Sequence, residues 1–153
     1  MKKKYVYIII SILVLILIDQ ITKLIISMTD STIFFIDGII QFTFTKNTGG
    51  AFSLAQNNLL GIIITNVIIL GIVTHFMITQ FNKMDKITKF CGSLILAGGI
   101  SNLLDRLIRG YVVDFIDITP ILNFPIFNTA DIYIVIGWAV FVVLTIKYTV
   151  KNK

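Results

Sequence analysis

Four long apolar segments, separated by shorter polar ones, dominate the pattern of this chain. Each is close to the roughly 20 residues that a helix needs to cross the hydrocarbon core of a bilayer. We therefore predict membrane-spanning helices at about residues 5–26, 59–78, 90–108 and 131–148. The first follows a cluster of lysines, as the core of a signal peptide would. Its apolar run is longer, however, and no small-residue cleavage site follows, so we expect this helix to be retained.

Two segments between the helices show a different pattern. Residues 28–57 include IIQFTFT, in which apolar and polar residues alternate as they do in a strand. Residues 110–130 combine β-branched alternation with two prolines, which favours an extended, partly interfacial loop. The expected fold is an all-α membrane protein. It forms a single domain of residues 1–153, with four transmembrane helices and an extracytoplasmic β-like cradle or loop region.

Composition and charge support a membrane protein and indicate its orientation. Of the 153 residues, 56% are hydrophobic, and the mean hydropathy of +0.93 is far above that of soluble domains. Nine of the 13 lysine and arginine residues lie near the two ends of the chain or between residues 81 and 89. The positive-inside rule therefore places these regions, and both termini, in the cytoplasm. Such a distribution is typical of orientation signals, so we expect no nucleic-acid partner.

The chain has one cysteine, Cys91, and one histidine, His75. A single chain can therefore assemble neither a disulfide nor a zinc site of cysteine and histidine ligands. We expect no metal and no cofactor, and any catalysis must use other side chains. His75 lies near the predicted cytoplasmic end of its helix, where a packing or interfacial role is favoured over a catalytic one.

Polar residues near the outer ends of two predicted helices form candidate functional faces. Asp19 and Lys23 share a face through their i, i+4 spacing, so they either neutralise each other or hold a polar ligand group. In the third helix, the small residues of CGSLILAGGIS allow close packing and predict a central position in the bundle. Near its end, Asn102, Asp105 and Arg106 stack on one face. That face either looks into a site or carries a structural Asp105–Arg106 ion pair.

Two further carboxylates are predicted to meet at the outer membrane surface. Asp114 follows the third helix, and Asp131 falls in the first turn of the fourth, which Asn128 or Thr129 can cap. Two carboxylates at a partly dehydrated site tend to share one proton, so one can deprotonate a water while the other donates to a scissile carbonyl. Such carboxylates could also bind a cation or relay protons in a small ion- or proton-coupled transporter. However, four spans without a visible repeat provide no path through the membrane.

Five short motifs carry a resemblance to a known family. They are Asp19-x-x-x-Lys23, Asn47-Thr-Gly-Gly-Ala-Phe52, Asn102-Leu-Leu-Asp-Arg106, Val112-Val-Asp-Phe-Ile-Asp117 and Phe127-Asn-Thr-Ala-Asp131. In this order, between four predicted spans, they resemble the bacterial lipoprotein signal peptidases, or signal peptidase II. The resemblance implies a membrane aspartic endopeptidase that removes signal peptides from diacylglyceryl-modified prolipoproteins and cuts before the lipidated cysteine. It also implies a multi-pass protein of the bacterial cytoplasmic membrane with its active site at the outer face. We expect this enzyme to contact membrane lipid and to act as a monomer.

The resemblance also assigns expected roles to individual residues. Asp114 and Asp131 occupy the positions of the two catalytic aspartates. The expected substrate-binding or supporting residues are Asp19, Lys23, Asn47, Asn102, Asp105, Arg106 and Asn128. The chain departs from the usual family pattern at Ser101, Gly50 and Ile132, where glycine, alanine and serine are common. None of these departures removes a charged or amide group, so we expect them to affect packing more than activity.

Overall fold

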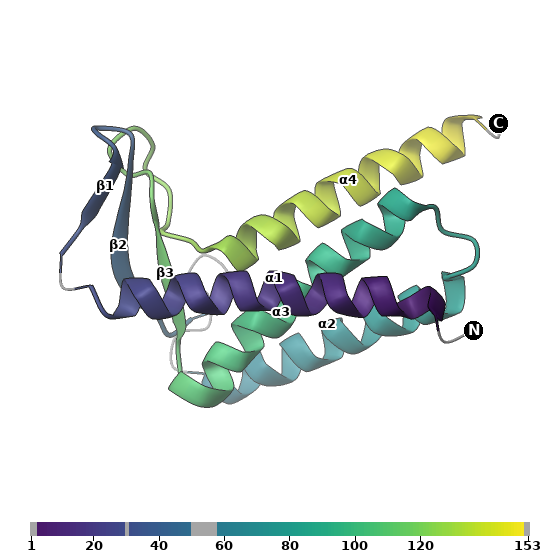
Figure 1. The fold of residues 1–153 in the computed structure, drawn as a ribbon, viewed down its shortest axis with the longest axis horizontal. Coiled ribbons are helices and arrows are strands. Elements are labelled where there is room, and N and C mark those ends of the chain that lie inside the picture. The colour runs from purple at the N-terminus through teal and green to yellow at the C-terminus, as the bar shows by residue number, and fades with distance from the viewer. Residues whose placement is uncertain (1–2, 30, 50–57, 152–153) are drawn as a thin grey trace.

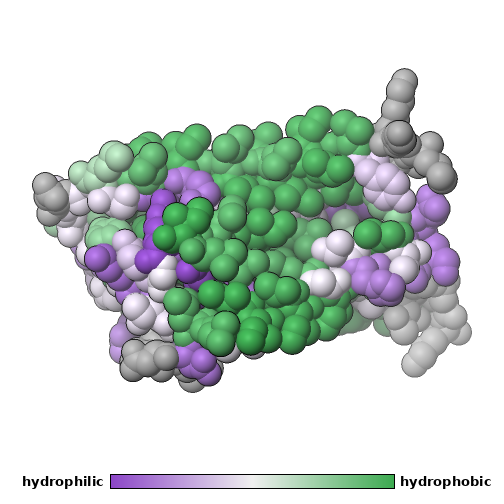
Figure 2. All heavy atoms as spheres, turned by 90° about the horizontal axis from the view of Figure 1, so that it is seen from below, coloured by the Kyte–Doolittle hydropathy of each residue, from purple (hydrophilic) through white to green (hydrophobic). Residues whose placement is uncertain are grey.

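The computed structural model describes residues 3–29, 31–49 and 58–151, which form four long helices and a small sheet (Figure 1). The helices are α1 (Lys3–Ser27), α2 (Leu59–Gln80), α3 (Lys86–Arg109) and α4 (Thr129–Lys151). All four are long and apolar enough to cross a membrane. On the face shown in Figure 2, apolar side chains cover the middle of the molecule and polar side chains gather towards its two ends. The predicted fold class is confirmed.

The beginnings of α3 and α4 are set by capping side chains. The helix α3 starts at Lys86, earlier than the predicted start near residue 90, because the Asp85 carboxylate accepts a hydrogen bond from the Thr88 N–H at 2.7 Å. At α4, the Asn128 side chain accepts from the Asp131 N–H at 2.9 Å. Of the two capping residues proposed from the sequence, Asn128 is therefore the one whose side chain caps α4.

The helix α3 is the centre of the bundle and packs against α1, α2 and α4. Its contact with α4 depends on glycines in both helices. A Cβ atom at Gly98 would lie 2.3 Å from the Ala130 carbonyl oxygen, and one at Gly137 would lie 2.9 Å from that of Cys91. Because no larger residue fits at either point, these glycines allow α4 to lie directly against α3 both at its first turn and at Gly137.

A three-stranded antiparallel sheet covers the end of the bundle opposite the chain termini (Figure 1), in the order β1 (Ile33–Ile36), β2 (Ile40–Asn47) and β3 (Val112–Asp117). The segment around β3 was predicted to be an extended loop. It becomes a strand because it pairs with β2, so that Asp114 lies opposite Thr45 and Val112 lies opposite Asn47. This sheet is the predicted β-like region.

Two sets of contacts fix β3 relative to the helices. Val113 and Phe115 are buried in an apolar cluster with Ile26 of α1. Because side chains alternate along a strand, Asp114 between them points to the opposite face. On the other edge of β3, Ile116 and Phe127 exchange backbone hydrogen bonds at 2.7 and 3.2 Å. The chain passes from Phe127 directly into α4, so this pairing brings the start of α4 next to β3.

Candidate active site

A cavity of about 730 Å³ lies where the sheet meets the helix ends. Five of the residues predicted to form a site line it: Asn47, Asn102, Arg106, Asp114 and Asp131. Much of the remaining wall is apolar and comes from the segment before α4 and from the first turns of that helix. The cavity therefore combines polar side chains with a surface suited to hydrocarbon.

Asp114 is held by two side-chain amides. The residue is only 3% exposed, and its two carboxylate oxygens accept from the Asn47 amide at 2.8 Å and the Asn128 amide at 2.7 Å. Burial raises the pKa of Asp114 to about 6, and the negative charge of Asp131 acts in the same direction. The two amide hydrogen bonds oppose this shift in the pKa because they stabilise the ionised form. Asp114 can therefore exchange a proton near neutral pH.

Asp131 lies in the first turn of α4 and takes part in a reciprocal cap. The Asn128 side chain accepts from the Asp131 N–H, and the Asp131 carboxylate accepts from the Asn128 N–H at 3.2 Å. The second carboxylate oxygen of Asp131 accepts from the Asn102 amide at 2.8 Å. Each oxygen of both aspartates thus receives one amide hydrogen bond.

Asn128 connects the two aspartates directly. Its side chain, which is fully buried, donates to Asp114, while its backbone N–H donates to Asp131. The same amide donates to the Asn102 side chain at 3.2 Å. Two carboxylates that are 17 positions apart in the sequence are consequently held on one cavity wall by a common residue.

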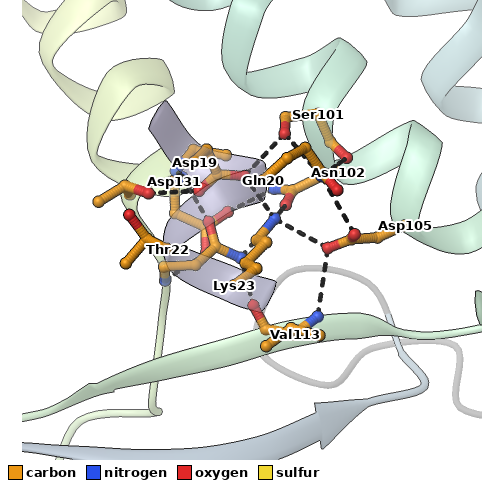
Figure 3. A network of polar contacts seen from close by, with 12 residues as sticks. Asp19, Gln20, Thr22, Lys23, Ser101, Asn102, Asp105, Val113 and Asp131 are labelled. Atoms are coloured by element: carbon orange, nitrogen blue, oxygen red, sulfur yellow. Dashed lines mark hydrogen bonds and ion pairs between the residues drawn. The ribbon is translucent and has the colours of Figure 1, made fainter. Parts of the chain in front are cut away.

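Behind this wall lies a buried ionic network centred on Lys23 (Figure 3). The Lys23 ammonium contacts the carboxylates of Asp19 at 2.7 Å and Asp105 at 2.9 Å, and donates to the side-chain oxygen of Asn102 at 2.8 Å. The side chains of Asp19, Lys23 and Asp105 are 0% exposed. Asp19 and Lys23 therefore neutralise each other inside the protein. Neither lines the cavity in the described part of the chain.

Asp19 also fixes the start of α4. One carboxylate oxygen accepts from the Ala130 N–H at 2.9 Å and from the Thr129 hydroxyl. The other accepts from the Ser101 hydroxyl at 2.7 Å. Ser101, one of the departures from the family pattern, thus supplies an additional donor to this network. Because Asp19 holds the turn that carries Asp131, it acts on the site through the position of α4.

The expected common face of Asn102, Asp105 and Arg106 is divided. Asp105 turns towards α1 and β3, where it pairs with Lys23 and accepts from the Val113 N–H at 3.3 Å. Its other oxygen pairs with Arg109 at 2.6 Å, so the proposed Asp105–Arg106 ion pair is replaced by two other pairs. Residues at i+3 and i+4 lie on either side of a helix face, and the buried ammonium of Lys23 attracts Asp105 to one side.

Arg106 turns to the cavity. Its guanidinium donates to the carbonyls of Asn102 at 3.3 Å and Gly49 at 3.1 Å. It therefore ties the segment after β2 to α3. Asn47 closes the turn in this segment, since its side-chain oxygen accepts from the Gly49 N–H at 3.0 Å. The motif continues into Gly50, Ala51 and Phe52, which lie outside the described residues.

Sequence reasoning missed two members of the buried network and gave no role to two residues of the cavity wall. Gln20 donates to Asp105 at 3.1 Å and to the Ser101 hydroxyl at 2.9 Å, and Arg109 pairs with Asp105. The presence of Gln20 inside an apolar run, and the i+4 spacing of Arg109 from Asp105, were the available signals. Asn66, a polar interruption of α2, lines the cavity, as does Ile132.

Four helices are long enough to cross a membrane, and Asn128 donates hydrogen bonds to two carboxylates on the wall of a cavity. This combination defines an integral membrane enzyme. The family model of signal peptidase (SPase) II matches residues 11–147. The chain belongs to the signal peptidase II family and is a peptidase of the aspartic class.

Individual relatives and solved structures agree with this family. The chain is 36% identical to the lipoprotein signal peptidase of Fusobacterium nucleatum over 144 residues, which cover 92% of this chain and 87% of the relative. It is 40% identical to that of Thermodesulfovibrio yellowstonii over 145 residues, covering 90% and 93%. A solved bacterial membrane enzyme superposes with a TM-score of 0.87 at 30% identity, covering 96% of this chain and 92% of the other. The protein is thus a multi-pass protein of a bacterial membrane.

Proposed function

We propose that this peptidase removes signal peptides from diacylglyceryl-modified prolipoproteins, cutting before the lipidated cysteine, with Asp114 and Asp131 as its catalytic pair. The observation that carries the proposal is the pair of carboxylates held by Asn128 on the wall of a largely apolar cavity. A transporter would need a polar path through the bilayer, whereas these carboxylates belong to β3 and to the first turn of α4. Both elements lie at the end of the bundle that carries the sheet (Figure 1).

The chemistry follows from two carboxylates that share one proton. The ionised carboxylate takes a proton from a water molecule, whose oxygen attacks the scissile carbonyl carbon. The protonated carboxylate donates a hydrogen bond to the carbonyl oxygen. As the C–N bond breaks, a proton passes to the leaving amine and the pair returns to its starting state. The raised pKa of Asp114 supports this scheme, because it favours retention of one proton by the pair close to neutral pH.

The remaining predicted residues have supporting roles in this proposal. Asn47 and Asn102 orient the two carboxylates, and Arg106 holds the substrate backbone with its planar group of donors. The inner network positions the elements that carry the pair. Its members are Asp19, Lys23, Asp105 and Asn128. One chain supplies both carboxylates and their supporting residues, which supports our proposal that the enzyme acts as a monomer.

The proposed location is the bacterial cytoplasmic membrane, with both termini in the cytoplasm and the cavity at the outer face. The lysine-rich ends and the segment between α2 and α3 support this orientation. A cavity at the membrane surface suits a lipidated substrate, since its acyl chains can stay in contact with the bilayer and with the apolar wall.

The direct test uses the purified chain in detergent with a synthetic peptide that carries a diacylglyceryl-modified cysteine. We expect one cut on the amino side of that cysteine, measured by mass spectrometry, and little cleavage of the same peptide without the diacylglyceryl group. Cation flux through liposomes containing the protein, without cleavage, would contradict the proposal and support transport.

Labelling in intact cells tests the orientation. Asp37→Cys and Thr119→Cys are expected to react with an impermeant thiol reagent added outside, whereas Asn82→Cys is expected to react only after the cells are opened. All three positions are exposed in the structure, and the native Cys91 is buried and gives a low background. Labelling of Asn82→Cys in intact cells would reverse the proposed topology.

A further inference from the structure

The cavity wall includes an asparagine, Asn66, that takes no part in the chemistry described so far. Asn66 lies within the apolar sequence IITNVIIL of α2 and is half-buried on the cavity wall. Among the described residues, it is the only member of α2 on this wall. Its helical neighbours Ile64, Val67 and Ile68 are exposed apolar residues. An amide is therefore present at bilayer depth on the face of α2 that meets the cavity.

The Asn66 side chain has no hydrogen-bond partner among the described residues. The other carboxamide, carboxylate and guanidinium side chains on the described wall are all hydrogen-bonded, namely Asn47, Asn102, Arg106, Asp114 and Asp131. An asparagine in a membrane helix is costly unless it bonds to a neighbouring helix or serves a site. Because Asn66 makes no such bond to another described helix, its amide is available to a ligand in the cavity.

The depth of Asn66 indicates which part of a substrate it can reach. Asn66 is seven residues from the outer end of α2, or about 10 Å along the helix axis. Asp131, in contrast, lies in the first turn of α4 at the mouth of the bundle. A peptide whose scissile bond reaches the aspartates must continue towards the membrane on its signal-peptide side, and this is the side on which Asn66 lies.

We infer that Asn66 is a substrate-binding residue that pairs with the substrate backbone on the signal-peptide side of the scissile bond; this inference rests on the proposed function. A signal peptide that leaves its helical conformation exposes N–H and C=O groups, which are costly in an apolar cavity. The Asn66 amide has a donor and an acceptor, as a peptide unit has. The ester groups of the diacylglyceryl moiety offer acceptors only, so they match one half of this amide.

Asn66→Leu separates this role from a structural one. The substitution nearly preserves volume and removes a polar group from the bilayer. We expect KM for the diacylglyceryl peptide to rise by roughly 3- to 10-fold, the loss of one or two neutral hydrogen bonds, with kcat nearly unchanged. The Tm should stay the same or rise. An unchanged KM, or a fall in Tm with proportional loss of active enzyme, would overturn the inference.

Thr65→Val is the matched control, because Thr65 is exposed on the same helix. Among the described residues, its hydroxyl bonds only to the Gly61 carbonyl of its own turn, at 2.8 Å. Its KM should equal that of the parent chain. A rise in KM equal to that of Asn66→Leu would show that any loss of polarity in α2 has the same effect, and would overturn a specific role of Asn66.

A series of substrates identifies the group that Asn66 binds. In three peptides, one of the three amide bonds before the scissile bond is replaced by an ester, which removes one N–H. For the parent enzyme, one of the three ester peptides should have a KM that is higher by about the same factor as the Asn66→Leu substitution produces. For the Asn66→Leu variant, the same ester should not raise the KM further. If the effects of the ester and of Asn66→Leu on KM multiplied independently for all three peptides, the inference would be overturned.

Two controls distinguish binding of the lipid from binding of the peptide, and failure of the proposed function from failure of this inference. A fourth peptide has an ether-linked lipid in place of the diacylglyceryl esters, and coupling of Asn66→Leu to this change alone would overturn the peptide assignment in favour of the lipid. Failure of the parent enzyme to cut any peptide would overturn the proposed function itself, whereas normal cleavage with an unchanged KM in Asn66→Leu would overturn only the inference about Asn66.

Discussion

Asp114→Asn and Asp131→Asn are each expected to reduce cleavage by roughly 10²- to 10⁴-fold, the usual contribution of a positioned acid or base. Asparagine keeps the volume and an amide of each side chain but cannot exchange the proton that the pair shares. Because both members act in one step, the double variant should be scarcely slower than either single variant. The measurement is the initial rate of cleavage of the diacylglyceryl peptide at matched concentrations of folded protein.

The stability of the Asp114→Asn variant distinguishes a chemical role from a structural one. The pKa of Asp114 is raised from 3.8 to about 6 in the folded protein. Its contribution to stability is therefore complete below pH 3.8 and is lost as the pH rises through 6, because the folded site disfavours the ionised form. The Tm of Asp114→Asn minus the Tm of the parent chain should therefore be larger at pH 8 than at pH 5, as measured by thermal unfolding.

Asp117→Asn is the control for a change of charge on the same strand. Asp117 accepts from the Gln41 amide at 2.7 Å and lies outside the described cavity wall. Its replacement should change cleavage only slightly. Substantial cleavage by a folded Asp114→Asn or Asp131→Asn protein would contradict the aspartic mechanism.

The pH dependence of the parent enzyme belongs to the same prediction. The value of kcat/KM should fall on both sides of an optimum, since the pair gains a second proton at low pH and loses the shared one at high pH. The high-pH limb should have an apparent pKa near 6 that belongs to the pair. Asn47→Ala should move this limb to higher pH, because the Asn47 hydrogen bond lowers the pKa of Asp114.

Lys23→Met is expected to destabilise the protein by about 3–5 kcal/mol, the usual cost of breaking a buried ion pair. The substitution leaves Asp19 and Asp105 buried without the ammonium that contacts both carboxylates. Since Asp19 also holds the first turn of α4, cleavage should fall with the amount of folded protein. The measurement is thermal unfolding in detergent together with the yield of monodisperse protein.

Two further variants test the electrostatic reason for this loss. Lys23→Met combined with Asp19→Asn should recover part of the stability, because the remaining Asp105 carboxylate still pairs with Arg109 at 2.6 Å. Lys46→Met removes an exposed lysine next to the Tyr111 ring and should cost less than about 1 kcal/mol. A Lys23→Met protein with the Tm of the parent chain would show that the buried network contributes nothing to stability.

The sequence by itself determined the class of fold and the local pairings. The lengths of the apolar runs predicted four membrane-crossing helices, because the thickness of the bilayer sets the length of each run. Alternation of apolar and polar residues in IIQFTFT predicted β2, because side chains along a strand point to opposite faces in turn. The pairing of Asp19 with Lys23 followed from their i, i+4 spacing alone.

Only the tertiary structure decided how the candidate site is assembled. Asn47 meets Asp114 across 67 positions of sequence because β2 pairs with β3, and Lys23 meets Asp105 because α1 packs on α3. The spacing of residues on one helix identifies which of them share a face, but the neighbours of that face depend on how the helices pack. For this reason Asp105 turned away from Arg106, and the linking role of Asn128 became visible only when α4 and β3 lay side by side.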